Sequence, residues 1–474
     1  MRYNRLLKDN DFLVETEYTK TLSEFAASLR YEDIPTTVLE RAKMILLQTI
    51  GVSLAAKDCD IARKIRKIAL EANNGNGGPA TAWITGEKIS AASAALIAGT
   101  VSDLLDWEDC SWTGHPSAGI IPAAWITAEE RGKSGKDLLT AIVTAYEVYQ
   151  RIANAAQPGP RRNELGWGLT SWQIFGVSAA AAKIYGFDPR RVDQTIGMSV
   201  ESSTIPACYH NTTMSDFYHY EHGYRARTGV LIVKAVEKGV HNQRDTLDAP
   251  NGYWDMITDE PKLEWLLKDL GKQWLIMETL LKHWPANMWV QAPAEALSEI
   301  VANNRIIPEE IEEIVVDPGI EDRMWIPEEG FRSVTQAEFS VPFVLSALVH
   351  DPVPGAAWYS KANLSNPSVI RLAQRVKEGA SRQISPGGGF AKFRLGDYPA
   401  HTVTVKTTDG RVLTAKAGKH PGHPHNMLTT RQFVERFELQ ASPVLRGERL
   451  KSAVDILLNI EGQANIAELS RVVS

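Results

Sequence analysis

Cysteine is scarce in this chain: three occur among its 474 residues, at Cys59, Cys110 and Cys208. They are too widely spaced for a CxxC metal site, and three thiols make no disulfide framework. An iron–sulfur cluster usually takes four thiolates, or thiolates with histidines, so none is expected. Unpaired thiols are typical of a reducing compartment, and we therefore expect a cytoplasmic protein.

An excess of positive charge is also absent. The formal net charge is -6, with 51 Lys and Arg against 57 Asp and Glu, which argues against a nucleic-acid partner. The most apolar stretches, Ile45–Ala56 and Ala91–Val101, are too short to cross a bilayer, and the first residues lack a signal-peptide pattern. We expect no membrane partner. A small anionic substrate would need a local group of cations, since the overall field would not attract it.

The common cofactor and nucleophile motifs are missing as well. The sequence contains no GxSxG, no Walker A motif and no HExxH. His420, His423 and His425 have a spacing that suits metal ligands, but the prolines between them indicate an irregular loop without an adjacent carboxylate. We therefore expect no metal and no other cofactor.

Helical patterns fill both ends of the chain. Residues 20–275 read mostly as helix, and Ile89–Ser102 is so rich in small uncharged residues that we expect it to be buried on all sides. The helical pattern returns after Thr429. These patterns predict a mainly α fold with a large all-helical domain built from both chain ends and a smaller α+β lid domain, divided into residues 1–275, 276–424 and 425–474.

The strand patterns lie in the middle of the chain. Ile311–Val316 is a short β-branched run, and His401–Lys416 is a hairpin pattern with Asp409-Gly410 as its two-residue turn. Between them, Ser365–Glu378 reads as helix. We therefore expect the strands to be confined to residues 276–424, with no parallel sheet in the first 250 residues.

The densest group of polar residues directly follows an apolar helix. It contains Asp106, Glu108, Asp109, Cys110 and His115. Buried charges are costly unless they are paired, so such a group favours an active site in which His115 transfers protons and an acid orients it. The alternative is a solvated loop after a helix C-cap.

Two further segments carry candidate residues. His210–Arg227 contains Tyr218, His222 and Arg225; its arginine could hold a carboxylate, or the segment could be a helix with a solvated face. Lys282, in Lys-His-Trp-Pro, lies where the helical pattern gives way to the middle region. A lysine there suits anion binding in a cleft, and a surface lysine before a turn is the alternative.

Several of these strings resemble the MmgE/PrpD family, whose members include 2-methylcitrate dehydratase, cis-aconitate decarboxylase and iminodisuccinate epimerase. The similar strings are Leu105–Asp109, His115–Ser117, Gly223–Gly229, Lys282–Pro285 and Gln336–Pro342. The resemblance implies a helical domain with an α+β lid, a homodimer, and catalytic roles for Asp106, His115 and Lys282.

The chain also departs from that family at positions near the expected site. Tyr218 stands where many members carry a lysine, and its hydroxyl is a further candidate proton donor. Cys110 replaces a threonine, and Thr170 ends a string in which Gly168 replaces a histidine. We expect Cys110, Thr170, His222 and Arg225 to bind substrate.

The residue types suit a lyase that removes a proton next to a carboxylate of a small hydroxy-polycarboxylate. Elimination of water needs a base, an acid for the departing hydroxyl, and cations for the charge that develops. An isomerase or epimerase of an iminodicarboxylate would share the first step. A binding protein that has lost catalysis is the third interpretation, favoured by the two departures from the family's lysine and histidine.

Overall fold

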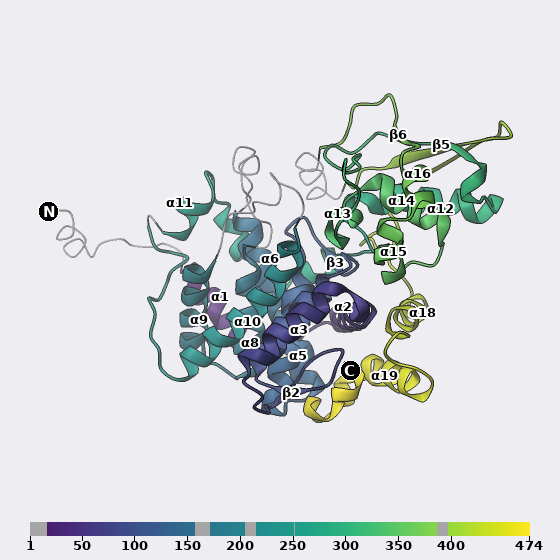
Figure 1. The fold of residues 1–474 in the computed structure, drawn as a ribbon. Coiled ribbons are helices and arrows are strands. Elements are labelled where there is room, and N and C mark those ends of the chain that lie inside the picture. Colours follow the sequence, from purple (N-terminus) through teal and green to yellow (C-terminus); the bar gives the residue numbers. More distant parts are fainter. Residues whose placement is uncertain (1–16, 157–170, 204–214, 251, 386–396) are drawn as a thin grey trace.

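The computed structural model describes residues 17–156, 171–203, 215–250, 252–385 and 397–474. Over these residues the chain is mainly α-helical, as the sequence predicts (Figure 1). The helices before residue 260 are α1 Tyr18–Ser28, α2 Thr36–Ala55, α3 Asp60–Ala72, α4 Ala91–Asp103, α5 Pro116–Arg131, α6 Gly135–Ala156, α8 Gln173–Ile184, α9 Pro189–Ser202, α10 Phe217–Glu237 and α11 Tyr253–Ile257. The later helices are α12 Gln291–Asn304, α13 Val334–Glu338, α14 Val341–His350, α15 Lys361–Leu364, α16 Pro367–Ala373, α18 Thr430–Ala441 and α19 Glu448–Leu458.

The strands fall into two groups. The longer ones form a four-stranded sheet in the order β6-β5-β7-β8, and the two-residue strands form isolated pairs. Their bounds are β1 Ala80–Thr81, β2 Lys88–Ile89, β3 Asp109–Cys110, β4 Leu280–Leu281, β5 Ile311–Asp317, β6 Val376–Glu378, β7 His401–Thr407 and β8 Val412–Ala417.

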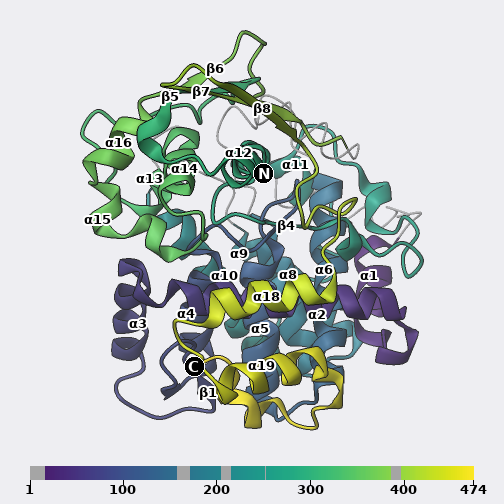
Figure 2. The same cartoon turned by 90° about the vertical axis from the view of Figure 1, so that its right-hand side faces the viewer.

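The two ends of the chain pack together. Helix α18 lies across α2, and α19 also contacts α2, so the C-terminal helices cover the N-terminal helical part (Figure 2). Helix α4 is buried at every position but Ala92, which confirms the expectation from its small uncharged residues. This packing supports the proposed division of the chain, in which both ends build the helical domain.

The middle of the chain carries the four-stranded sheet. The predicted hairpin is confirmed as β7 and β8, with Gly410 at a φ of 89° in its turn. Helix α12 packs against both strands of that hairpin. The predicted helix over Ser365–Glu378 is wrong in its second half, because Val376–Glu378 pairs in parallel with β5. The prediction that strands are confined to 276–424 is also wrong, since β1, β2 and β3 lie earlier in the chain.

Helices α4 and α10 approach each other closely at two glycines. A Cβ on Gly99 would lie 2.7 Å from the Cα of Gly223, and a Cβ on Gly223 would overlap the carbonyl oxygen of Leu96 and Oγ1 of Thr100. The lack of a side chain at Gly99 and Gly223 allows this approach. It brings the C-terminal end of α4, with Asp103, next to the N-terminal half of α10.

We expect Gly223→Ala to destabilise the protein by about 1–3 kcal/mol, because the added methyl group overpacks this helix crossing. Denaturant unfolding would measure the change. Gly77→Ala is the matched control: its Cβ would meet nothing within 4 Å, so its stability should stay within about 0.5 kcal/mol of wild type. Equal stability of the two variants would contradict the prediction.

Candidate active site

The polar loop between α4 and α5 folds back on the end of α4. The loop turns at Asp106, whose φ is 44°, and its backbone N–H donates to the carbonyl of Asp103 over 2.8 Å. A second turn is closed by two backbone hydrogen bonds between Ser111 and Gly114, of 2.9 and 3.0 Å. These turns aim acidic side chains and His115 back toward Asp103.

Buried hydrogen bonds from α6 and α8 hold the loop in place. The carbonyl oxygen of Thr113 accepts from the Tyr149 hydroxyl over 2.6 Å and from Nε1 of Trp172 over 2.5 Å. Asp109 accepts from the Tyr146 hydroxyl over 2.5 Å and from the backbone N–H of Ser117 over 2.9 Å. Asp109 therefore anchors the loop rather than facing His115.

His115 lies between a carboxylate and a phenol. Its Nδ1 is 2.5 Å from Oε1 of Glu108 and 3.1 Å from Oδ1 of Asp103, and its Nε2 is 2.9 Å from the Tyr218 hydroxyl. Burial and the nearby Lys282 disfavour protonation of the ring, but Glu108 and Asp103 outweigh them and raise the pKa of His115 to about 10. The structure thus joins two predicted residues, His115 and Tyr218, in one hydrogen bond.

We expect His115 to remain protonated at neutral pH. Because its folded-state pKa of about 10 exceeds the value of about 6.5 in an unfolded chain, its contribution to stability is complete below about pH 6.5. That contribution is lost as pH rises through about 10. The unfolding midpoint of wild type should therefore fall more steeply over this range than that of His115→Gln. An NMR titration of His115 with a midpoint near pH 6.5 would contradict this.

Lys282 reaches the same cluster from the other side of the loop. Strand β4 pairs with β3, and the N–H of Lys282 donates to the carbonyl of Glu108 over 3.1 Å. Its Nζ contacts Oδ1 of Asp106 and lies 2.5 Å from Oε1 of Glu108. Burial opposes the charge, yet Asp106 and Glu108 hold the pKa of Lys282 well above its usual value. The ammonium group is therefore already paired with carboxylates.

The backbone of Lys282 is fixed by both ends of the chain. Its carbonyl oxygen accepts from Nε2 of Gln48 in α2 over 3.2 Å and from Nη1 of Arg436 in α18 over 2.9 Å. Residues almost 400 positions apart thus position one side chain, because the packing of α18 on α2 brings them together.

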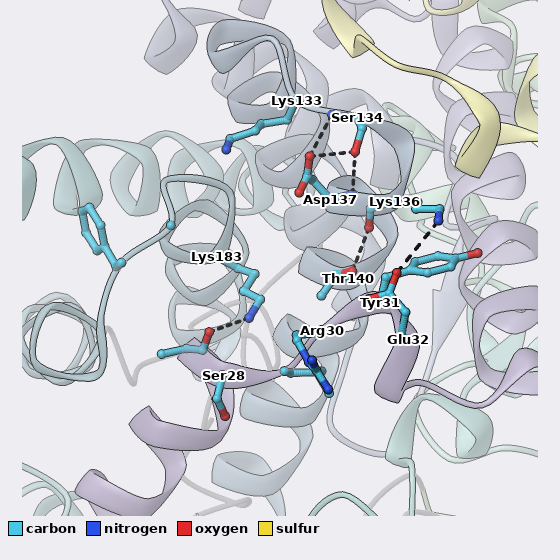
Figure 3. Close-up of a pocket in the computed structure, with 14 residues that line it drawn as sticks. Ser28, Arg30, Tyr31, Glu32, Lys133, Ser134, Lys136, Asp137, Thr140 and Lys183 are labelled. Atoms are coloured by element: carbon cyan, nitrogen blue, oxygen red, sulfur yellow. Dashed lines mark hydrogen bonds and ion pairs between the residues drawn. The ribbon is translucent and has the colours of Figure 1, made fainter.

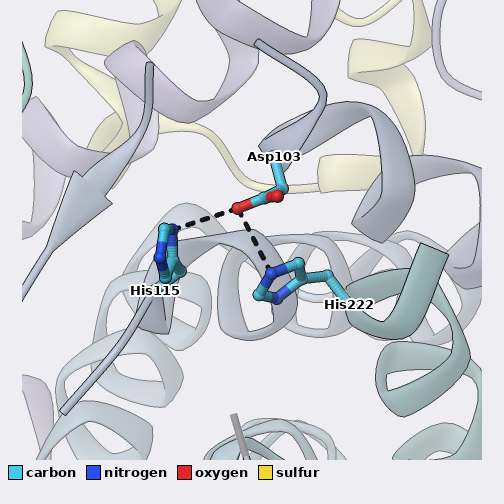
Figure 4. A group of neighbouring side chains, drawn as sticks. All are labelled: Asp103, His115 and His222. Atoms are coloured by element: carbon cyan, nitrogen blue, oxygen red, sulfur yellow. Dashed lines mark ion pairs between the residues drawn. The ribbon is translucent and has the colours of Figure 1, made fainter. Parts of the chain in front are cut away.

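Asp103 lies between two buried histidines, His219 and His222. Neither of them was assigned to catalysis from the sequence. Oδ2 of Asp103 is 2.8 Å from Nδ1 of His219. Oδ1 of Asp103 is 3.2 Å from Nε2 of His222 (Figure 4). His219 also reaches the middle region, where its Nε2 is 2.9 Å from Oε1 of Glu338. Burial opposes ionisation of Asp103, but the flanking imidazoles of His222 and His115 keep its pKa well below the usual range.

Three residues of this group were missed from the sequence: Asp103, His219 and Glu338. Asp103 and Glu338 each carried a weak signal. Asp103 is the charged end of the otherwise uncharged α4, and Glu338 is an acid between Ala337 and Phe339. A carboxylate in an apolar run is costly unless it is paired, so both positions called for a buried cation.

The other predicted residues that the structure describes have partners of their own. Arg225 pairs with Glu221, one helical turn earlier, over 3.2 Å. The thiol of Cys110 donates to the carbonyl of Ser111 over 3.3 Å and lies 3.4 Å from the sulfur of Met288. His222 accompanies Asp103, as described. Thr170 lies outside the described residues.

The cluster also has donor atoms that could surround a metal ion. Asp103, Asp106, Glu108 and His115 offer ligand atoms within 4.8 Å of one another. However, the ammonium group of Lys282 contacts two of these carboxylates and supplies positive charge among them. The arrangement therefore suits proton transfer between fixed charges.

A surface cavity of about 490 Å³ lies elsewhere, at the N-terminal end of α6 (Figure 3). It is lined by Arg30, Lys136 and Lys183 among others. The ammonium group of Lys183 already donates to the carbonyls of Ala26 and Ala27, over 2.9 and 2.8 Å. The cavity contains none of the predicted site residues, and we assign it no role.

Fold and site together define a mainly α protein with a buried cluster of carboxylates, imidazoles and one ammonium group. The chain belongs to the MmgE/PrpD family. Residues 20–266 match the MmgE/PrpD N-terminal domain and residues 284–460 match the C-terminal domain. The resemblance inferred from the sequence is thereby confirmed.

Relatives of known activity match along nearly the whole chain. Cis-aconitate decarboxylase of Aspergillus terreus is 23% identical over 479 residues, covering 95% of this chain and 94% of that protein. Cis-aconitate decarboxylase of Homo sapiens is 22% identical over 461 residues, covering 94% and 92%. Among the described residues, no helix is long and apolar enough to cross a membrane.

Proposed function

We propose that the chain is a lyase that acts on a small polycarboxylate by transferring a proton at a carbon next to a carboxylate. The observation that carries the proposal is the position of the His115 imidazole between Glu108 and the Tyr218 hydroxyl, where the raised pKa of the ring favours its protonated form. A buried proton on this hydrogen-bonded chain of Glu108, His115 and Tyr218 can be delivered to a substrate carbon or taken from it without reorganising solvent.

The fixed charges around this pair have distinct parts in the proposed chemistry. Asp106 lies 3.5 Å from the Tyr218 hydroxyl and contacts Lys282, so it can orient both groups. Burial raises the pKa of Glu108 to about 7, although Lys282 and His115 oppose that shift. Glu108 can accept a hydrogen bond from the Nδ1–H of His115, so the proton that the ring gives up or takes back is the one on Nε2, on the side of Tyr218.

Two reactions fit this arrangement. In a dehydration, the proton next to the carboxylate leaves for the base, a carbon–carbon double bond forms, and hydroxide departs with a proton as water. In a decarboxylation, the bond to a carboxylate breaks, carbon dioxide leaves, and the electron pair on carbon takes a proton. The relatives are cis-aconitate decarboxylases, and a protonated His115 suits the second reaction, which needs an acid but no base to take a proton from carbon.

The test is incubation of the purified protein with di- and tricarboxylates in deuterated water, followed by NMR. Cis-aconitate, 2-methylcitrate and an iminodicarboxylate cover the three reaction types. Loss of carbon dioxide with deuterium in the product, or loss of water with formation of a double bond, would support the lyase. Deuterium exchange without net product would indicate an isomerase instead. No exchange and no product with any of these acids would rule out the proposal.

We further propose that the protein is a homodimer in a reducing cytoplasm. One face of α10 exposes Phe217, Tyr224 and Leu231, spaced seven residues apart, and such an apolar stripe suits an interface with a second helix. Cys59 and Cys110 are buried free thiols, as expected in that compartment. Light scattering on the eluting protein would give the mass and test the dimer.

A further inference from the structure

A polycarboxylate substrate needs cations, and two of the buried cations around the candidate site are already paired. Lys282 contacts Asp106 and Glu108, and Arg225 pairs with Glu221 over 3.2 Å. Burial of a further carboxylate beside these pairs would be costly without a cation of its own. A further buried cation that is not already paired is therefore needed near the site.

Arg323, in the loop between β5 and α13, is a buried arginine of this kind. It is 6% exposed and forms no ion pair with the described residues. Its Nη1 donates to the carbonyl of Asp322 over 2.7 Å, while its buried Nε has no hydrogen-bond partner within the described chain. A buried guanidinium with an unused donor is unfavourable in the free protein, and a bound anion would correct this.

The guanidinium packs on Phe339, whose ring packs in turn against Tyr218. Its Cζ is 5.1 Å from the ring centroid of Phe339, and that ring meets the ring of Tyr218 edge-on at 5.0 Å. Burial lowers the pKa of Arg323, whereas Asp322, Tyr218 and Asp106 act in the opposite direction. Its charge is therefore felt at both Tyr218 and Asp106.

The loop holds Arg323 in a defined position. The left-handed backbone of Asp322, with a φ of 58°, lets its carbonyl accept from both Arg323 and Nε1 of Trp325, the latter over 3.0 Å. The carbonyl of Arg323 accepts from the N–H of Val341 at the start of α14 over 2.9 Å. A side chain fixed in this way loses little further entropy when it binds a ligand.

We propose that Arg323 binds a carboxylate of the substrate beside Tyr218, and that this contact selects acids with a carboxylate beyond the one at the reacting carbon. The planar fork of a guanidinium matches a carboxylate through paired hydrogen bonds. The inference rests on the proposed function, which it deepens by assigning a substrate-binding residue in the middle region of the chain.

Calorimetric titration of the full chain with tricarballylate and butyrate, two unreactive acids with three carboxylates and one, tests the assignment. Arg323→Gln should bind tricarballylate about ten- to a hundredfold more weakly and lose less affinity for butyrate. Arg323→Lys should fall between, because it keeps the charge but not the fork. The control Arg332→Gln removes an exposed arginine that pairs with Glu329, and its affinity should not change.

Equal tricarballylate affinity of wild type and a folded Arg323→Gln would overturn the assignment, as would a wild type that binds no tricarboxylate. If Arg323→Gln does not fold, Arg323→Lys carries the test, and unchanged affinity overturns the assignment. Failure of the proposed function alone looks different: binding would still depend on Arg323, but the wild type would exchange no proton next to a carboxylate.

Discussion

Replacing His115 with alanine should lower kcat/KM by about a hundred- to ten-thousandfold, the range typical of a general acid–base group. The ring connects Glu108 at Nδ1 with Tyr218 at Nε2, so its removal breaks the path along which the proton moves. Lys282 and Asp106 would remain paired with each other. The loss should therefore fall on kcat more than on KM, because the groups that fix the cluster persist.

Steady-state kinetics with the substrate identified by NMR, after circular dichroism has confirmed folding, would measure the effect. His241→Ala is the matched control, since His241 is an exposed residue after α10 and should keep wild-type kinetics. A folded His115→Ala enzyme with near-wild-type kcat/KM would remove His115 from the mechanism. Tyr218, with Asp106 nearby, would then be the remaining candidate for proton transfer.

Local patterns predicted the parts of the fold that depend on neighbours in the sequence. The burial of α4 follows from its small uncharged residues, and the hairpin of β7 and β8 follows from alternation around Asp409-Gly410. Strand β6 escaped prediction because its partner β5 lies about sixty residues away and its own three residues carry no alternation. The two-residue strand β3 is likewise defined by its partner β4, 170 residues later.

Some residues of the candidate site could also be predicted from neighbours in the sequence, and others could not. Asp106, Glu108 and His115 share one loop, so their association was visible in the sequence. The link from Asp103 through His219 to Glu338 joins three separate helices, and neither spacing nor composition connects them. Arg323 carried no local signal at all, because what distinguishes it is burial without an ion-pair partner among the described residues, a property of the folded chain.

The structure changes what we expect of Lys282. The sequence suits Lys282 to anion binding, and a lysine that held a substrate carboxylate would mainly raise KM when replaced by alanine. Its ammonium group is instead fully buried against Asp106 and Glu108. Because Lys282 already neutralises two carboxylates of the protein, its main role is to stabilise the folded site. Its effect on substrate affinity is indirect.

Lys282→Met should therefore destabilise the protein by about 3–5 kcal/mol at neutral pH, because it leaves two buried carboxylates without their cation. The loss should shrink as pH falls: Lys282 opposes the rise that burial causes in the pKa of Glu108, so without Lys282 that pKa lies further above its unfolded value, and protonation removes the unpaired charge. Urea unfolding of both proteins at several pH values below neutrality measures this. The control Lys451→Met removes an exposed lysine that pairs with Glu448, and its stability should stay within about 0.5 kcal/mol of wild type. A stable Lys282→Met protein with only a raised KM would restore the substrate-binding role and show that the buried pairs contribute little to folding.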